Sequence, residues 1–267
     1  MKKVTALVAV LVVALATAGS ALAQTGDVQI DGNDHPNVGA LLMPRADGSL
    51  RIICTGTLVS PRVFLTAGHC TSYMQSNGFS RAYVTFDSNF GTDPDHNIFA
   101  TKYVGTIVTN PDYHDPYQND TALVFLDDSV KKIAPAAIAP LGFLNGLRAS
   151  GVISDTSFLN VGYGSAEQLV VPQAGPTFPF DGIRKWTIST FTTLDPEFIH
   201  LNQNIHQGNS GTGYGDSGGP TFVDTANGPV IVSVVSTGDG PCYATSVNER
   251  VDTSNAHAFL DPYLALG

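Results

Sequence analysis

The chain has 267 residues, of which 43% are hydrophobic and 13% are charged, and it contains 27 Gly and 16 Pro. These values exclude a disordered tail, a coiled coil and a collagen-like repeat. Charged residues reach only about half of their usual share of roughly 25%, so Ser, Thr, Asn and Gly must cover the surface. This composition favours strands and turns over helices, and we expect an all-β protein of one large domain or two barrels.

The first 23 residues are predicted to be a signal peptide. Lys2 and Lys3 precede an almost unbroken run of Ala, Val and Leu, which ends in the A-x-A cleavage site Ala21-Leu22-Ala23. The run is shorter than the roughly 20 residues that span a bilayer. We therefore expect a secreted protein that begins at Gln24 and has no contact with the membrane after cleavage.

Cleavage at this site makes the chain more acidic. Lys+Arg falls from 13 to 11 against 23 Asp+Glu, so the formal net charge goes from −10 to −12. Nucleic acid is not an expected partner, because phosphate binding depends on clustered Lys and Arg. The acidity favours solubility and indicates no particular partner, and we expect a monomer that needs no cofactor.

About twelve short strands are predicted, each bounded by Gly, Pro, Asn or Asp. They cover 38–43, 51–59, 63–66, 82–86, 102–109 and 122–126, and then 157–163, 184–192, 198–202, 220–223, 229–236 and 244–251. Between the two groups, Pro135 and Pro140 favour an extended connector, because proline cannot donate a ladder hydrogen bond. The domain boundary is placed there, which gives an N-terminal segment at 24–36 and two units at 37–140 and 141–267.

Two of the predicted elements carry a clear periodicity. In the strand 184–192, Trp186 and Ile188 share one face and polar residues share the other, which predicts a half-buried strand. One helix is predicted at the C-terminus, where Ser254 can cap it. Apolar residues follow at i, i+3, i+4 and i+7, namely Ala256, Phe259, Leu260 and Tyr263. Pro262 is expected to kink or restart this helix.

The three cysteines, Cys54, Cys70 and Cys242, cannot all be paired. Export permits a disulfide, and one between Cys54 and Cys70 would close a short loop, stabilising the fold by about 3 kcal/mol in the chain-entropy model. Cys242 has no obvious partner and is expected to be a small buried hydrophobic side chain.

Three segments carry side chains of the types that take part in catalysis. They are Leu65-Thr66-Ala67-Gly68-His69-Cys70, Asn119-Asp120-Thr121-Ala122-Leu123-Val124-Phe125-Leu126 and Gly215-Asp216-Ser217-Gly218-Gly219-Pro220. A serine hydroxyl needs an adjacent base to become a nucleophile, and the base needs a carboxylate to fix its tautomer and stabilise its cation. Glycines beside Ser217 allow backbone N–H groups to approach a developing oxyanion.

Each segment also has a purely structural interpretation. His69 alone could be a structural histidine beside a disulfide, Asp120 after an Asn is typical of a turn, and the glycines around Ser217 could form a tight turn. The three structural interpretations together are improbable, because the segments lie at strand ends and supply the residue types of a nucleophilic serine site.

With these three segments, the sequence resembles the trypsin/chymotrypsin-like serine peptidases. The family patterns T-A-[AG]-H-C, N-D-[IT]-A-L and G-D-S-G-G-P match residues 66–70, 119–123 and 215–220. The resemblance covers nearly all of 30–264. It implies two six-stranded antiparallel β-barrels with a short C-terminal helix, an active site between the barrels, a polypeptide substrate and a disulfide between Cys54 and Cys70.

The resemblance also implies residue roles. His69 would be the general base, Asp120 its orienting carboxylate and Ser217 the nucleophile that forms the acyl-enzyme. The backbone N–H groups of Gly215 and Ser217 would form the oxyanion hole. Ser236 stands where the family has a serine behind the aspartate.

The chain departs from the family pattern at four places. Thr237 stands where a tryptophan usually follows the serine, and Tyr163 replaces another common tryptophan. Gly213 stands where the partner of Cys242 is expected. The start at Ile30 resembles the terminus of activated members only loosely, and no Arg or Lys precedes it.

The last departure concerns Asp216, whose side chain is expected to be buried. Burying its carboxylate without a partner would cost much free energy. In activated family members a freed N-terminal ammonium pairs with the corresponding aspartate. Here, cleavage of a short propeptide after Gln29 would free Ile30, or signal cleavage would provide Gln24, or an internal donor takes this place. The sequence leaves these alternatives open.

The substrate pocket is placed by counting from the motif. The residues assigned to it are Gly211, Thr212, Ser236, Gly238 and Ser246. Gly211 occupies the position of the floor aspartate found in members that cleave after Arg or Lys, so we expect cleavage after neutral residues. Asp239 at the rim would give only a weak preference for basic residues.

Two other functional classes were weighed. Residues 215–219 also satisfy G-x-S-x-G, the nucleophile elbow of α/β-hydrolase esterases. That fold requires acid and histidine after the serine, and only His257 follows Ser217. A peptidase fold kept as a catalytically silent binding module is the other alternative, although all three motif residues are present.

Metal binding is only weakly indicated. Asp87, Asn89, Asp93 and Asp95 offer oxygen atoms of the kind that bind calcium, although a solvated acidic loop is favoured. Four of the seven histidines, His96, His114, His200 and His206, were considered as zinc ligands and lack zinc-site spacing. No metal is expected.

Overall fold

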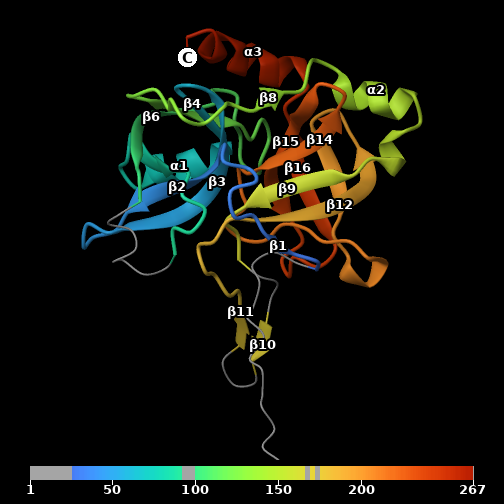
Figure 1. Cartoon of the computed structure of the whole chain (residues 1–267), viewed down its shortest axis with the longest axis horizontal. Helices are drawn as coiled ribbons and strands as arrows, with labels where there is room; N and C mark the ends of the chain where they lie inside the picture. Colours follow the sequence, from blue (N-terminus) through green and yellow to red (C-terminus); the bar gives the residue numbers. More distant parts are fainter. Residues whose placement is uncertain (1–25, 92–99, 166–168, 172–174, 267) are drawn as a thin grey trace, which may run out of the picture.

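The computed structural model describes residues 26–91, 100–165, 169–171 and 175–266. Two antiparallel β-barrels stand side by side, and the C-terminal helix α3 (Ser254–Leu264) lies across one end of both (Figure 1). The signal peptide and propeptide interpretations concern residues 1–29, of which only 26–29 are described. No helix in the described part of the chain is long and apolar enough to cross a membrane.

The first barrel closes in the order β2-β3-β4-β7-β6-β5. Its strands are β2 (Val38–Pro44), β3 (Leu50–Ser60), β4 (Val63–Thr66), β5 (Arg81–Thr85), β6 (Tyr103–Thr109) and β7 (Ala122–Leu126), with helix α1 (Gly68–Ser76) directly after β4. The pairing of Thr66 with Ala122 places the end of β4 beside the start of β7. The histidine and aspartate motifs, which continue from these strand ends, therefore lie close together.

The second barrel consists of six strands as well, closed by the pairing of β12 with β9. They are β9 (Phe158–Gly162), β12 (Lys185–Leu194), β13 (Phe198–Asn202), β14 (Pro220–Thr225), β15 (Gly228–Gly238) and β16 (Thr245–Arg250). The serine motif leads into β14, and the N–H of Thr55 on β3 donates to the Ser217 carbonyl, so the motif lies against the first barrel.

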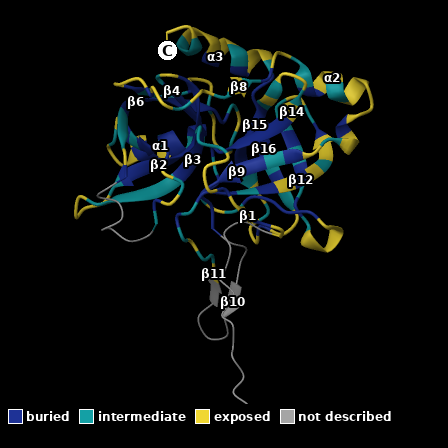
Figure 2. Ribbon diagram, in the orientation of Figure 1, coloured by how far each residue is buried: buried dark blue, intermediate teal, exposed yellow. Residues whose placement is uncertain are grey.

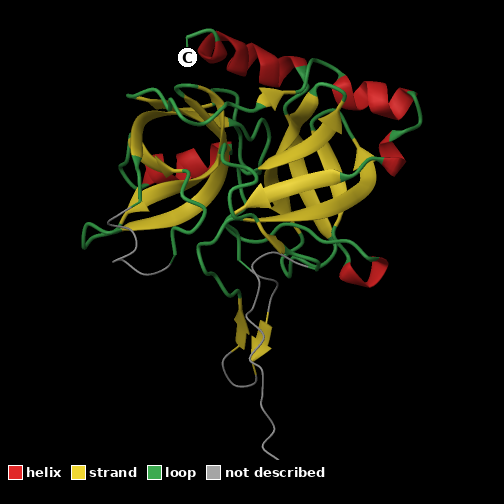
Figure 3. Ribbon diagram, viewed as in Figure 1, coloured by secondary structure: helices red, strands yellow, loops and turns green. Residues whose placement is uncertain are grey.

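Smaller elements attach to these barrels (Figure 3). They are β1 (Gln29–Ile30), β8 (Ala137–Ile138), α2 (Phe143–Ala149), the 3-10 helices at Ile153–Asp155 and Ile205–Gln207, and the β10 (Leu169–Val171) and β11 (Gly175–Thr177) hairpin. β1 pairs with β12, and β8 runs parallel to β15, so both segments join the second barrel.

Buried side chains fill both barrels and the seam between them (Figure 2). A first cluster around Leu41, Phe64 and Met74 lies inside the first barrel. A second one joins Leu65 and Leu123 of that barrel to residues of the second barrel and to Leu260 of α3. The packing across the seam fixes the two barrels relative to each other, and the site motifs lie at this junction.

All twelve predicted strands are present, and the double barrel predicted from the resemblance is confirmed. The domain boundaries at 36/37 and 140/141 stay predictions. The helix count was wrong: α1 and α2 were missed. Helix α2 begins at Phe143, at the end of the stretch interpreted as an extended connector. Its seven residues are too short to show a helical period.

The C-terminal helix was predicted correctly, with two differences in detail. Its N-cap is Thr253, whose hydroxyl accepts the N–H of Ala256 at 3.2 Å, and Ser254 is the first helical residue. The helix continues through Pro262, which lies in its last turn. Few residues follow it in the helix, so the proline disturbs few backbone hydrogen bonds.

The alternation in β12 is present, but its buried face is the polar one. Lys185, Thr187 and Ser189 are fully buried, whereas Ile188 is exposed. Hydrogen bonds explain this orientation, because Ser189 Oγ donates to the Ser210 carbonyl at 2.7 Å and accepts from the Asn160 amide at 2.9 Å. The interior of the second barrel thus contains a hydrogen-bonded network next to the site.

Candidate active site

The ends of β4 and β7 position a histidine and a carboxylate against each other. His69 is the second residue of α1, and Asp120 precedes β7. Oδ1 of Asp120 accepts the backbone N–H of His69 at 2.7 Å, and Oδ2 lies 2.7 Å from Nδ1 of the imidazole. The Asp120 side chain is fully buried, while that of His69 is 22% exposed. Two bonds from one carboxylate fix both the backbone and the ring of His69.

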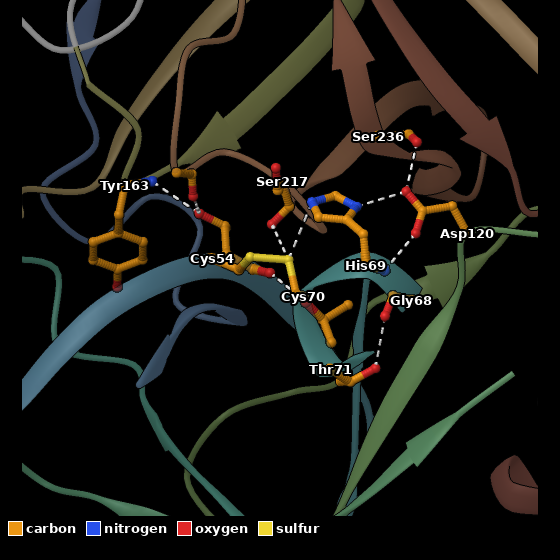
Figure 4. The surroundings of a disulfide bond; sticks show 12 residues. Cys54, Gly68, His69, Cys70, Thr71, Asp120, Tyr163, Ser217 and Ser236 are labelled. Carbon is orange, nitrogen blue, oxygen red and sulfur yellow. Dashed lines mark hydrogen bonds and ion pairs between the residues drawn. A yellow bond between two sulfur atoms is a disulfide. The ribbon is translucent and has the colours of Figure 1, made fainter. Parts of the chain in front are cut away.

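A third residue contacts the same carboxylate. Ser236 on β15 donates its hydroxyl hydrogen to Oδ2 of Asp120 at 2.5 Å. Together with the bond to Nδ1, it aligns the carboxylate so that the imidazole carries its hydrogen on Nδ1 and leaves Nε2 as the free nitrogen. Figure 4 shows His69 between Ser217 and Asp120, with Ser236 above the Asp120 carboxylate.

Ser217 is held at the junction by its backbone. Its carbonyl oxygen accepts the N–H of Thr55 at 2.9 Å, and both Ser217 and His69 line one pocket. In this structure the Ser217 hydroxyl makes no hydrogen bond to the imidazole, and Nε2 lies 3.5 Å from Sγ of Cys70. Loose contacts between nucleophile and base are common before substrate binds.

The disulfide predicted between Cys54 and Cys70 is present, and it connects β3 to α1 directly beneath His69 (Figure 4). Cys54, His69 and Cys70 also form the one cluster of potential metal ligands in the described residues. Both sulfur atoms are consumed in the disulfide, so this cluster lacks a thiolate for a metal. Asp93 and Asp95 of the suggested calcium loop lie outside the described residues.

The glycines of the serine motif are required by close approaches. Gly218 has φ +77°, and a Cβ there would lie 2.2 Å from Oγ1 of Thr66. Gly215 has φ +102°, a region that other residues rarely adopt. Among the described residues, no acceptor is bonded to the N–H groups of Gly215 and Ser217, whereas that of Asp216 donates to Gly213 at 3.1 Å.

Asp216 is 1% exposed, as expected from the sequence. Its carboxylate accepts the backbone N–H groups of Gly164 and Gly213, both at 2.8 Å. Ile30, one of the candidate termini, is 60% exposed in β1. Within the described residues these two N–H groups bind the carboxylate, whereas Gln24, the other candidate terminus, lies outside the described residues.

Lys185 supplies a positive charge near Asp216. It lies opposite Gly162 in the pairing of β12 with β9, and a Cβ on Gly162 would be 2.1 Å from Oδ1 of Asp216. The Lys185 ammonium is held by the Asp181 carboxylate at 2.6 Å. Burial lowers the pKa of this lysine, whereas Asp181 and, more weakly, Asp216 act to raise it.

A pocket of about 270 Å³ opens beside His69 and Ser217. Three of the five residues assigned to it from the sequence line it, namely Thr212, Ser236 and Gly238. Gly211 and Ser246 do not. Ser246 is fully buried behind Thr212, and their hydroxyl oxygens are 2.9 Å apart.

The side chain of Gln203 occupies the space beside Gly211. A Cβ on Gly211 would lie 2.2 Å from Cβ of Gln203 and 2.3 Å from its Oε1. Oε1 accepts the backbone N–H of Thr212 at 3.0 Å. Because that N–H can only donate, the oxygen must face it, and Nε2 is left without an acceptor among the described residues.

The counting argument missed further lining residues, among them the large side chains of Gln203, Tyr117 and Tyr214. Tyr117 has φ +66° and packs edge-on against the His69 ring, with 5.4 Å between centroids. Neither Gln203 nor Tyr117 lies in a motif, so no local signal in the sequence marks them. Tyr214 lies between Gly211 and Ser217, the interval over which positions were counted.

Asp239 and Cys242 also line the pocket. Asp239 accepts three backbone N–H groups from residues 243–245, at 2.7–2.9 Å, and these bonds lower its pKa. Cys242 is a free, buried cysteine, as predicted, and burial raises the pKa of its thiol to about 11.

Two closed six-stranded barrels, with a histidine, a carboxylate and a serine at their junction, are the architecture of chymotrypsin-like peptidases. Comparison with known proteins agrees, since the family model described as Trypsin matches residues 25–256. The chain belongs to the trypsin family.

Two curated relatives carry peptidase names. The chain is 27% identical over 218 residues to a protein named trypsin from Saccharopolyspora erythraea, a match that covers 78% of this chain and 83% of the relative. It is 25% identical over 115 residues to a venom serine protease from Polistes dominula. That second match covers 42% of this chain and 40% of the relative.

Proposed function

We propose that this trypsin-family chain is a secreted serine endopeptidase that cleaves polypeptides through an acyl-enzyme. His69 is the general base, Asp120 orients it, and Ser217 is the nucleophile. The observation that carries the proposal is the buried Asp120 carboxylate, which is bonded to Nδ1 of His69 at 2.7 Å and to Ser236 at 2.5 Å. This arrangement leaves Nε2 of His69 able to accept a proton in the pocket that Ser217 lines.

In the first half of the reaction, Oγ of Ser217 attacks the carbonyl carbon of the scissile bond while Nε2 of His69 takes the hydroxyl proton. The carbonyl oxygen becomes an oxyanion, for which the N–H groups of Gly215 and Ser217 are available donors. Collapse of this intermediate breaks the C–N bond, and the imidazolium gives its proton to the leaving amine. Water then hydrolyses the acyl-enzyme by the same steps.

We also propose that the pocket accepts neutral side chains. The place of a floor carboxylate is taken by the uncharged Gln203, whose Nε2 can donate to an oxygen atom of a substrate side chain. The carboxylate of Asp239, which lines the pocket, accepts hydrogen bonds from three backbone N–H groups. A buried guanidinium or ammonium at the pocket floor would have no anionic partner, which is unfavourable.

The triad is tested by labelling and by substitution. A serine-directed phosphonylating reagent should modify Ser217 in the parent protein, and Ser217→Ala should lower kcat by about 10⁴ or more with the fold intact. A folded parent that neither reacts nor cleaves peptides would favour the silent binding module. Cleavage of esters without cleavage of peptides would favour the esterase.

A further inference from the structure

A row of polar side chains crosses the interior of the second barrel and reaches the substrate pocket. Neighbouring members are hydrogen-bonded at 2.7–2.9 Å, and the row consists of Thr212, Ser246, Asn248, Thr221, Asn160, Ser189 and the backbone carbonyl of Ser210. Thr212 lines the pocket and is 5% exposed, whereas the five side chains that follow it are fully buried. Because each hydroxyl has a single hydrogen, the direction of every bond follows once one end is known.

The Ser210 carbonyl sets the direction at the far end of the row, because a carbonyl can only accept. Ser189 therefore gives its hydrogen to Ser210 and accepts from the amide nitrogen of Asn160. The Asn160 oxygen then faces Thr221, so Thr221 donates to it and accepts from the amide nitrogen of Asn248. The orientation of each amide in the row is thus fixed by its neighbour.

The same rule fixes the hydroxyl group of Thr212 at the pocket end. The Asn248 oxygen accepts the one hydrogen of Ser246 at 2.7 Å. The Thr212 hydroxyl lies 2.9 Å from Oγ of Ser246 and must therefore donate to it. Oγ1 of Thr212 also lies 3.5 Å from Oε1 of Gln203, but its hydrogen is already used in the shorter bond. Toward a ligand in the pocket, this hydroxyl can act only as an acceptor.

Gln203 offers the opposite group beside Thr212. Its side chain is 1% exposed and lines the same pocket. Its Oε1 accepts the Thr212 N–H, and its Nε2 has no acceptor among the described residues. A buried amide N–H without a partner is unfavourable, so a ligand atom that accepts from Nε2 would stabilise the complex. The pocket therefore presents a donor and an acceptor on two adjoining side chains.

We propose that this pocket selects a primary carboxamide, so that the peptidase cleaves after glutamine or asparagine. The carboxamide oxygen accepts from Nε2 of Gln203, and the carboxamide nitrogen donates to Oγ1 of Thr212. The inference rests on the proposed function, because it names the substrate of that same site. Neither the motifs nor the count from Ser217 indicates this preference, which depends on the direction of the buried hydrogen bonds.

Side chains of similar shape lack one or both of these bonds. A glutamate accepts from Nε2 of Gln203 but places its other oxygen against the lone pairs of Thr212, in a pocket that the Asp239 carboxylate also lines. A methionine or leucine leaves Nε2 without an acceptor and Oγ1 without a donor. A site built for hydrogen bonds rejects analogues that lack them, because its buried polar groups then stay unpaired.

The first test uses the parent protein and peptides that differ only in the residue before the scissile bond. Glutamine is compared with glutamate and methionine, and asparagine with aspartate and leucine, because the members of each set are similar in size. We expect kcat/KM for the better carboxamide peptide to exceed that of both of its matched analogues by about tenfold or more. This comparison needs no variant.

The second test changes the direction of the bond at Thr212. Ser246 does not line the pocket, yet Ser246→Ala frees the hydrogen of Thr212, which can then donate to a substrate carboxylate. In S246A the preference for the carboxamide over the acid should fall severalfold, whereas the preference over the apolar analogue should remain. Thr212→Val is the matched variant: it removes the acceptor itself, so both preferences should fall. Thermal unfolding checks that each variant is folded.

The outcomes distinguish the carboxamide pocket from the proposed function. An active parent that cleaves after acidic, apolar or basic residues in preference to both carboxamides would overturn the carboxamide pocket and leave the peptidase activity in place. An unchanged preference for the carboxamide over the acid in folded S246A would contradict the bond direction on which the inference depends. A folded parent that cleaves none of the peptides would overturn the proposed function, and with it this inference.

Discussion

Oδ2 of Asp120 accepts two hydrogen bonds, one from the Ser236 hydroxyl at 2.5 Å and one from Nδ1 of His69 at 2.7 Å. The two donors come from different barrels, since Ser236 lies on β15 and His69 on α1. The orientation of the imidazole therefore depends on how the barrels pack against each other. Leu65 and Leu123 of the first barrel, which belong to the same apolar cluster as Val234 of β15, contribute to that packing.

Replacing Ser236 by Ala removes one of these two bonds and leaves the other. A hydrogen bond to a charged group contributes about 1.5–3 kcal/mol, so we expect kcat to fall about tenfold or more in S236A. KM should change little, because the bond acts on the imidazole in the transition state. Steady-state kinetics on a peptide substrate measure both parameters. A rise in KM at constant kcat would contradict the positioning role and assign Ser236 to substrate binding alone.

Glu249, a buried acid on β16, links pH to the stability of the fold. Its pKa is about 8 in the native protein and near 4.5 in the unfolded chain, so between these values the native state binds more protons than the unfolded state. The free energy of unfolding contributed by this group therefore falls as pH rises through that window. Relative to E249Q, the parent should lose about 2 kcal/mol or more between pH 5 and 8.5.

Urea unfolding of both proteins at several pH values measures this difference. Glu249→Gln should have the flatter pH dependence and the higher midpoint at pH 8.5. Parallel curves for the two proteins would show that Glu249 is already ionised at pH 5. Because the comparison uses only unfolding, it is independent of any effect on kcat.

Gly162 and Gly164 make room for the Asp216 carboxylate. A Cβ on Gly162 would lie 2.1 Å from Oδ1 of Asp216, so Gly162→Ala must displace this carboxylate from the N–H groups of Gly164 and Gly213. The neighbouring oxyanion donors at 215 and 217 would shift with it. We expect G162A to lower kcat/KM by about a hundredfold or more, since small displacements of catalytic groups have effects of this size.

The matched control for G162A is Gly146→Ala. Gly146 lies within α2, and a Cβ there meets no atom within 4 Å. This substitution should leave kinetics unchanged and raise stability by up to about 1 kcal/mol through helix propensity. Near-parental kinetics of folded G162A would contradict the importance of the Asp216 position.

The sequence predicted the strands well because each begins and ends at Gly, Pro, Asn or Asp residues that act locally. The resemblance of the motifs to a known family predicted that His69 and Asp120 act together, and the pairing of Thr66 with Ala122 explains why they lie close to each other. It failed where the cause is tertiary. The inward polar face of β12 depends on partners such as Ser210 and Asn160, which are distant in the sequence.

The pocket shows the same limit. Gly211 was assigned to the floor by its separation from Ser217, but Gln203, from the segment after β13, fills that space. Counting residues along the chain cannot reveal a side chain that enters from another segment.

Gln203 gives the sharpest test of substrate specificity. Its Oε1 is bonded to the Thr212 N–H, and its Nε2 is the uncharged donor at the pocket floor. Gln203→Glu keeps the acceptor for Thr212 and replaces the amide group by a carboxylate oxygen. A substrate guanidinium would then find an anionic partner in the pocket, as bidentate Arg–carboxylate pairs require.

The preference of both proteins is measured by competition in one reaction. The competing peptides differ only in the residue before the scissile bond. The parent should cleave after neutral residues, with Arg and Lys disfavoured because their charge would be buried without a partner. In Q203E the preference should shift toward Arg and Lys by about tenfold or more, which corresponds to one charged hydrogen bond. A hundredfold preference of the parent for Arg or Lys would contradict the neutral pocket and assign the charge recognition to Asp239, an acid that lines it.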